Sequence, residues 1–283
     1  MATEPISHDP SAAMAQALAA SDLKSRLLKH QQFQSAILED SHDFVVYLPP
    51  TYAVEQERLF PVLFMQDGQN LFDPETSFMK GNYWCLGETA DELMLRGEIE
   101  PLVMVGIYNT GEHRVDEYTP VEDRRLGGGN ADAYGRMLVE ELLPFIAESY
   151  RVSATGANCG VGGSSLGGLV SMYLGLRYPE IFGKLAIMSP SVWWHNRAIL
   201  RTVRQLPGNT GQRIWLDIGT NESRRALPDV RLLKEALQQK GWREGENLGY
   251  MEAEGADHSE GAWAQRVAPM LKFLFPAQRH NGV

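Results

Sequence analysis

The octapeptide VGGSSLGG, near the middle of the chain, contains two adjacent serines among four glycines. The pattern Gly-x-Ser-x-Gly is satisfied around Ser165, which Gly163 and Gly167 flank. Around Ser164 it fails, because Leu166 stands where the second glycine would be needed. In this pattern the glycines allow a strand to reverse into a helix while the serine occupies a strained apex and exposes its hydroxyl. The spacing therefore predicts Ser165 as a nucleophile, and a plain Gly/Ser turn before a helix is the alternative.

A serine hydroxyl needs a general base, and on sheets of this kind the histidine follows the nucleophile and the acid in chain order. Three histidines follow Ser165, namely His195, His258 and His280. His280 stands in a polar tail, and His195 stands at an expected helix start in SVWWHNR. His258 lies in EAEGADHSEGAW, a loop between the last expected strand and the last expected helix. We predict His258 as the base, with His195 as the second choice.

The base needs a carboxylate that orients it. The expected strand RIWLDIG contains Asp217 and ends in TNES, which contains Glu222. Because ligands and catalytic groups gather beyond the carboxyl ends of parallel strands, Glu222 is the predicted acid. Asp217 is expected to be a structural carboxylate satisfied by neighbouring backbone amides, and Asp257 should point away from the adjacent His258.

Negative charge that develops on a substrate oxygen also needs hydrogen-bond donors. One expected donor is the backbone N–H of Leu166, directly after the nucleophile. The second should come from the loop after an early strand, MQDGQN, where the N–H of Gln69, or alternatively of Gly68, is the candidate. An ordinary tight turn at Asp67 and Gly68 is compatible with this role, because the donors belong to the main chain.

Aromatic and charged residues near these segments are candidates for substrate contacts. Trp84, Trp193 and Trp194 could form a wide apolar wall for an aromatic acyl or alcohol group; core packing is the equally favoured alternative for each. Arg114 and Glu117, in EHRVDEYTP, could contact a polar substrate, and a surface ion pair is the alternative.

The elements that must position these residues alternate along the chain. Continuous apolar runs predict strands, which fall within residues 43–50, 60–66, 101–110, 159–165, 183–191, 213–220 and 247–255. Apolar residues at helical spacing predict helices, which fall within residues 83–98, 130–150, 166–182, 227–241 and 260–275. A further short amphipathic helix is considered over Met14–His30. Apolar strands alternating with helices predict an α/β fold with a mostly parallel central sheet and helices on both faces.

The domain organisation expected from this pattern is simple. Residues 1–30 form a peripheral N-terminal segment, residues 31–276 a single α/β domain, and residues 277–283 a C-terminal tail. The segment DRRLGGGN, residues 123–130, is the expected flexible loop. Its three glycines do not predict a phosphate loop, because no strand precedes them and no Lys-Ser/Thr pair follows.

Composition and charge argue against several kinds of partner and cofactor. The net charge of −10 disfavours nucleic acids and anionic membranes as partners, and no apolar run is long enough to span a bilayer. We expect no metal site and no cofactor, since the chain contains no CxxC, HExxH or His/Cys cluster. Cys85 and Cys159 could be bridged, but two cysteines in a chain of this length, with no secretory signal pattern, favour reduced thiols and a cytoplasmic location. A homo-oligomer is left open.

Several segments in order resemble the α/β-hydrolase family described as "putative esterase", which includes enterochelin-esterase-like and esterase-D-like enzymes. The resemblance runs from about residue 43 to residue 274, and its pieces are VVYLPPTY, PVLFMQDGQNLFD, VGIYNTGEHRVDEYTP, GGSSLGG, YPEIFGKLAIMSPSVWW, DIGTNES and DHSEGAWAQR. It implies an α/β-hydrolase fold and a serine esterase with the triad Ser165, Glu222 and His258. Many relatives have His where Gln66 stands here.

The resemblance implies a small-molecule ester as substrate and leaves its identity open among siderophore, feruloyl, acetyl-sugar, thioester and simple aryl esters. Two alternatives use the same fold. One is an acyltransferase with the same triad, and the other is a non-catalytic binding protein, whose signature would be a missing triad member.

Overall fold

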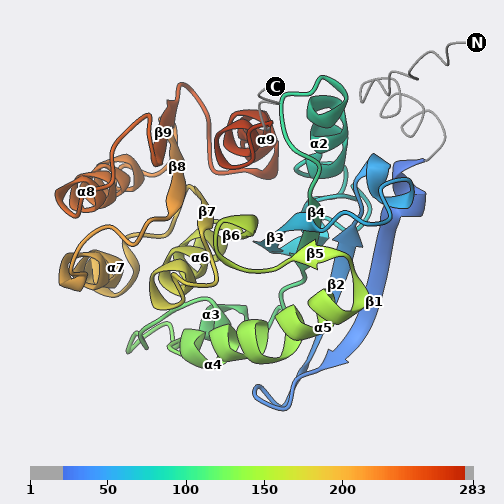
Figure 1. Ribbon diagram of the computed structural model, residues 1–283. Coiled ribbons are helices and arrows are strands. Elements are labelled where there is room, and N and C mark those ends of the chain that lie inside the picture. The colour runs from blue at the N-terminus through green and yellow to red at the C-terminus, as the bar shows by residue number, and fades with distance from the viewer. Residues whose placement is uncertain (1–21, 278–283) are drawn as a thin grey trace, which may run out of the picture.

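The computed structural model describes residues 22–277, which form a nine-stranded sheet with helices on both faces (Figure 1). The strands are β1 (Leu27–Gln34), β2 (Ser41–Tyr47), β3 (Phe60–Gln66), β4 (Val103–Ile107), β5 (Val152–Ser153), β6 (Cys159–Ser164), β7 (Lys184–Met188), β8 (Arg213–Gly219) and β9 (Leu248–Ala253). Their order is β1-β2-β4-β3-β6-β7-β8-β9, and β5 pairs with β3. Only the pairings of β2 with β1 and β4 are antiparallel.

The helices divide into two layers. They are α2 (Leu86–Leu95), α3 (Arg114–Glu117), α4 (Ala131–Arg136), the π-helical segment η4 (Met137–Leu142), α5 (Leu143–Ser149), α6 (Leu166–Arg177), α7 (Trp194–Gln205), α8 (Ala226–Gln239) and α9 (Glu260–Leu274). Short 3₁₀ turns lie at η1 (Leu23–Arg26), η2 (Pro50–Ala53), η3 (Gly68–Asn70) and η5 (Gly156–Asn158). Helices α2 and α9 enclose one apolar core, and helices α4 to α8 enclose the other (Figure 1).

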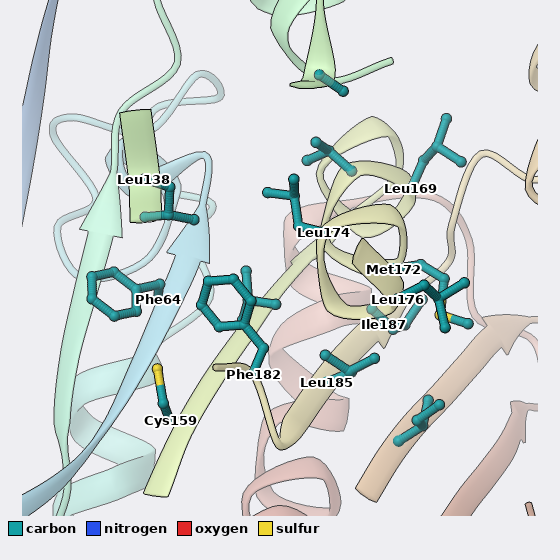
Figure 2. Packing of buried hydrophobic residues seen from close by; sticks show 14 of the residues in the cluster. Phe64, Leu138, Cys159, Leu169, Met172, Leu174, Leu176, Phe182, Leu185 and Ile187 are labelled. Carbon is teal, nitrogen blue, oxygen red and sulfur yellow. The ribbon is translucent and has the colours of Figure 1, made fainter. Parts of the chain in front are cut away.

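Burial of the central strands explains why they appear in the sequence as continuous apolar runs. Every residue of β3, β4 and β7 is buried, as expected where helices cover both faces of a parallel sheet. Figure 2 shows Phe64 of β3, Leu185 and Ile187 of β7 and Leu174 of α6 within the core that helices α4 to α8 enclose. The predicted mostly parallel sheet with helices on both faces is confirmed.

The N-terminal part of the domain differs from expectation. The helix considered over Met14–His30 is wrong where the structure describes it, because Leu27–Gln34 form β1, and residues 14–21 lie outside the described residues. Strand β1 is antiparallel to β2, with Leu27 opposite Tyr47 and Gln34 opposite Ser41. Antiparallel pairing with β2, the next strand along the chain, determines the structure of this segment, whose own apolar spacing also suits a helix. The expected boundary at residue 30 falls inside β1.

The loop DRRLGGGN is tied to its surroundings by hydrogen bonds. Asp123 and Gly127 exchange two backbone hydrogen bonds of 2.8 and 2.9 Å, and the N–H of Gly129 donates to Thr119 Oγ1 at 2.9 Å. Gly127, Gly128 and Gly129 have φ values of 73°, 90° and 100°. The three glycines therefore serve a backbone conformation that other residues rarely adopt.

Among residues 22–277, no helix has both the length and the apolar character needed to cross a bilayer. Within the same range, no group of three or more His, Cys, Asp or Glu side chains is placed to hold a metal ion. Cys85 and Cys159 are both free, and burial raises the pKa of the Cys159 thiol well above its usual range.

Candidate active site

Four neighbouring parallel strands end at one edge of the sheet. Ser164 of β6 pairs with Met188 of β7, and Met188 pairs with Asp217 of β8. Strand β9 continues the sheet in the same direction. The chain leaves β6, β8 and β9 at this edge, and the three predicted triad residues follow those strands: Ser165, Glu222 and His258.

Ser165 occupies a sharp turn between β6 and α6, with φ 57° and ψ −122°. A Cβ atom at Gly163 would lie 2.9 Å from Gln66 Cβ and 3.0 Å from the Gly167 carbonyl carbon. A Cβ atom at Gly167 would also lie 2.9 Å from Gln66 Cβ. The two glycines are therefore required by close packing against β3, and they permit the strained turn that the sequence predicts.

The Ser165 hydroxyl is half-buried and lies beside the loop that follows β7. Its Oγ atom is 3.5 Å from Ser191 Oγ, and the Ser191 N–H donates to the Ser165 carbonyl at 2.9 Å. Among the described side chains, no hydrogen bond joins Ser165 Oγ to His258. Catalytic hydrogen bonds are often long or misaligned in unliganded enzymes and shorten when substrate binds.

Glu222 and His258 form a close pair. His258 Nδ1 donates to Glu222 Oε2 at 2.7 Å, and Glu222 Oε1 accepts from Ser189 Oγ at 2.5 Å and from the Gly219 N–H at 3.0 Å. The Glu222 side chain is 2% exposed, whereas His258 is 44% exposed. Burial raises the pKa of the Glu222 carboxyl, but these three hydrogen bonds outweigh it and leave the pKa below its usual range.

The His258 ring is held on a second side by aromatic packing. Its plane meets the Trp263 ring at 82° with 4.9 Å between centroids, and Trp263 packs in turn on Trp84 at 5.8 Å. When the neutral ring donates from Nδ1 to Glu222, its Nε2 atom carries the free lone pair. The pair therefore has the arrangement of a general base and its orienting acid.

The other carboxylates considered for the acid make different contacts. Asp217 is fully buried, accepts from Trp215 Nε1 at 2.8 Å and from the Ser189 N–H at 3.3 Å, and lies 3.5 Å from Arg266 Nη1. Of the backbone amides expected to satisfy the Asp217 carboxylate, only that of Ser189 donates to it within the described part of the chain. Asp257 accepts from Ser259 Oγ at 2.5 Å, which directs its carboxylate away from the adjacent histidine.

Asp217 should matter for stability. Burial raises its pKa to about 6 even though Arg266 lies beside it. Asp217→Ala would leave the Arg266 guanidinium, which is 2% exposed, without its nearest carboxylate. Loss of one partner from a buried pair costs about 3–5 kcal/mol, so thermal unfolding should show a fall in melting temperature on the order of 10 °C.

The control for this prediction is an ion pair at the surface. Arg231 and Glu252 lie 2.7 Å apart with side chains 53% and 28% exposed, and such pairs contribute about 0–1 kcal/mol. Glu252→Ala should therefore change the melting temperature much less. Equal shifts for the two variants would contradict a structural role for the buried pair.

The backbone donors expected for an oxyanion make no internal hydrogen bond. The N–H groups of Leu166 and Gln69 donate to no residue that the structure describes. The loop that carries Gln69 is braced by Asp67, which adopts a left-handed conformation and accepts two hydrogen bonds of 2.7 Å from Arg114 and one of 2.7 Å from Asn109. Neither amide therefore has a protein acceptor among the described residues.

Arg114 and Glu117 are engaged by the protein itself. Arg114 makes the bidentate pair with Asp67 and is 26% exposed, so it matches the ion-pair alternative more closely than a free substrate contact. Glu117 is buried and accepts from His42 Nε2 at 3.0 Å and from Thr110 Oγ1 at 3.2 Å. It offers no carboxylate to a substrate.

The prediction that three tryptophans form an apolar wall for the substrate is wrong for two of them. Trp84 and Trp194 are each 2% exposed and belong to the core, and Trp194 Nε1 donates to the Val121 carbonyl at 2.7 Å. Large indole rings stabilise a core when their N–H finds a partner, which explains this placement of Trp194. Trp193, which is 46% exposed, remains available to a ligand.

Gln66 and His195 also have defined surroundings. Gln66 is fully buried, and its Oε1 accepts a hydrogen bond from the Tyr134 hydroxyl, so the side chain packs behind the turn at Ser165. His195 begins a run of three left-handed residues within α7, with φ 42°. His280 lies outside the described residues.

The sequence does not predict three residues that support the acid: Ser189, which donates to Glu222, and Trp263 and Arg266, which donate to Ser189. Ser189 directly follows β7, the neighbour of the nucleophile's strand, and a polar residue at that position is a signal that the sequence contains. Trp263 and Arg266 lie in the segment DHSEGAWAQR, shortly after His258, but nothing in that segment predicts that they contact Ser189.

A polar cavity of about 680 Å³ lies elsewhere on the sheet edge, near the end of β4. Its lining residues are Gln31, Gln32, Asp40, Ser41, Asp43, Tyr108, Asn109, Thr110, Glu112 and His113. It includes none of the triad candidates, so we do not assign it to their chemistry.

The family model described as "Putative esterase" matches residues 35–274. The chain belongs to this esterase family. It is a carboxylic-ester hydrolase with an α/β-hydrolase fold.

Individual proteins are similar to the chain over different shares of its length. The chain is 30% identical over 249 residues to "Uncharacterized protein YbbA" of Bacillus subtilis, a match that covers 83% of this chain and 93% of the relative. It is 31% identical over 150 residues to an endo-1,4-beta-xylanase/feruloyl esterase of Xylanibacter ruminicola, covering 51% of this chain and 19% of that protein. The solved structure of an IroE-like serine hydrolase from Shewanella oneidensis has the same fold, with a TM-score of 0.70, 18% identity and coverage of 87% and 78%.

Proposed function

We propose that this esterase cleaves its substrate through an acyl-enzyme on Ser165, with His258 as general base and Glu222 as the acid that orients it. One observation carries the proposal. A serine in a strained strand-to-helix turn follows β6, and a histidine–carboxylate pair of 2.7 Å follows β8 and β9, at the same edge of the sheet. This is the chain order and placement that a serine hydrolase of this fold requires.

In the proposed reaction, His258 Nε2 takes the proton of the Ser165 hydroxyl as Oγ attacks the ester carbonyl. The carbonyl oxygen becomes an oxyanion, which accepts hydrogen bonds from the N–H groups of Leu166 and Gln69. The C–O bond to the alcohol then breaks, and the imidazolium returns its proton to the leaving alcohol. Water repeats the sequence on the acyl-enzyme, releasing the acid and restoring the serine.

The substrate in this proposal is a small-molecule ester with an aromatic or other apolar group. Trp193 supports this choice, because the residue is 46% exposed and follows Ser191 by two positions in the sequence. The Ser191 hydroxyl in turn contacts the nucleophile. The relative described as a feruloyl esterase acts on an aromatic ester by its own name. An ester panel with short acyl, feruloyl, acetyl-sugar, trilactone and thioester compounds would rank these classes by kcat/KM.

A covalent probe tests the nucleophile directly. The protein should react with a fluorophosphonate, and peptide mapping should place the label on Ser165 rather than on the adjacent Ser164. Prior heat denaturation should abolish labelling, because activation of the hydroxyl depends on the folded site. A folded protein that does not react, or a label on another serine, would contradict the proposal.

A further inference from the structure

We propose that Ser189 is a positioning residue for the acid–base pair and that its hydroxyl connects Glu222 to the buried cation of Arg266. The inference rests on the proposed function and extends it to a residue outside the triad. Ser189 directly follows β7, between the strand that leads to Ser165 and the strand that leads to Glu222.

The contacts of the Ser189 hydroxyl determine where its proton points. Trp263 Nε1 donates to Ser189 Oγ at 3.1 Å, and Arg266 Nη2 donates to the same atom at 3.0 Å. Both groups are donors only, and a hydroxyl has two acceptor lone pairs and one proton. The remaining neighbour is Glu222 Oε1 at 2.5 Å. Both lone pairs are therefore occupied, and the single proton is directed at the carboxylate.

The backbone of Ser189 supports a role for the side chain. Its φ of 41° lies in the left-handed region, where a glycine would be less strained. Backbone strain of this kind persists where surrounding structure or function requires it. The hydroxyl is what serine supplies and glycine lacks, and all of its hydrogen-bonding capacity is used within the site.

The titratable and charged groups around Glu222 come from three elements. They are His258 in the loop before α9, Asp217 on β8 and Arg266 on α9. Arg266 is 2% exposed, and its bond to Ser189 is the only hydrogen bond that its side chain makes to a described residue. One buried cation thus faces two carboxylates, Asp217 directly at 3.5 Å and Glu222 through the serine hydroxyl. This arrangement favours the ionised, correctly oriented form of Glu222.

Ser189→Ala tests the inference. Loss of a hydrogen bond to a charged group should lower kcat for p-nitrophenyl acetate by about 10- to 100-fold, with KM nearly unchanged. Because the Glu222 carboxylate loses a donor that stabilises its anion, it should hold the proton that it shares with His258 more tightly. The acid limb of the kcat/KM profile, which the coupled acid–base pair sets jointly, should therefore move up by about one pH unit. Activity close to that of the parent, or a loss with an unmoved acid limb, would overturn the inference.

The matched control is Ser171→Ala. Ser171 is a fully buried serine whose hydroxyl has no hydrogen-bond partner among the described residues, so its removal should leave the profile unchanged. If Ser189→Ala does not fold, Ser189→Cys retains most of the volume with a weaker donor and should show the same upward shift. Thermal unfolding establishes which variants are folded.

A double-variant cycle shows whether Ser189 acts through Glu222. In a Glu222→Gln background, Ser189→Ala should change the residual kcat by less than about twofold, because the carboxylate it positions is gone. A full additive loss would mean that Ser189 acts by another route. Ser165→Ala distinguishes failure of the proposed function from failure of the role of Ser189. Turnover that survives Ser165→Ala refutes the proposed function. If Ser165→Ala abolishes turnover and Ser189→Ala retains the parent's activity, only the role of Ser189 is refuted.

Discussion

Replacing Ser165 with alanine should lower kcat for p-nitrophenyl acetate by about 10⁵-fold, while KM and the melting temperature change little. Removal of a nucleophile from an acyl-transfer triad costs rates of this order, and what remains comes from binding and oxyanion stabilisation. The substitution deletes one half-buried hydroxyl whose contact with Ser191 is 3.5 Å long, so the fold should tolerate it.

The adjacent serine provides the control for this result. Ser164 is buried in β6 and precedes the turn, so Ser164→Ala should retain turnover within about threefold of the parent, as expected away from the reacting atoms. Steady-state kinetics on both variants decide between the two serines of the octapeptide. Loss of activity in the Ser164 variant alone would show that the nucleophile has been assigned to the wrong residue.

Glu222→Gln should lower kcat by about 10⁴-fold with the fold retained. The amide is nearly isosteric but carries no charge, so it neither stabilises the imidazolium formed at His258 nor favours the tautomer that leaves Nε2 free. Ser189 and Gly219 donate to Oε1 of the native carboxylate, and the substituted amide would keep its oxygen toward these two donors. Its NH₂ group would then face the histidine in place of an acceptor.

Neighbouring carboxylates test the specificity of this effect. Asp257→Asn changes a carboxylate that pairs with Ser259 and should retain activity within about threefold. If Asp217→Asn were instead the variant that lost about 10⁴-fold while Glu222→Gln remained active, the acid would have been assigned to the wrong strand position. Stopped-flow assays with a chromogenic ester have the range to measure residual rates at these levels.

Local patterns in the chain were sufficient for most of the framework. The apolar runs of β3, β4, β7 and β8 and the periodicity of α6, α8 and α9 predict elements that the structure contains. The turn at Ser165 is also a local feature, because the need for glycine at 163 and 167 is visible in five consecutive residues. The helix start expected at His195 falls at the beginning of α7, although no extent was predicted for that helix. Strand β1 was assigned wrongly as part of a helix, since pairing with β2 determines its structure.

The residues of the site likewise separate into those that local patterns predict and those that depend on tertiary packing. Motif order and strand ends lead to Ser165, Glu222 and His258, and the pairing of the last two agrees with that expectation. Burial and ion pairing determined the roles of the predicted substrate-contact residues. Trp84 and Trp194 became core residues, and Arg114 became the partner of Asp67. Whether an aromatic or charged side chain faces a ligand or the interior depends on which distant segment packs against it, and spacing along the chain carries no such information.

The sequence alone was thus enough to predict the esterase class and to name candidates for the nucleophile, the base and the acid, because each of these leaves a short local signature in an expected chain order. The contacts that surround the candidate acid, Glu222, could be found only in the tertiary structure. Ser189 donates to Glu222 from the end of β7, and Trp263 and Arg266 of α9 donate to Ser189. Hydrogen bonds between segments so far apart in sequence exist only after the sheet and its helices have packed together.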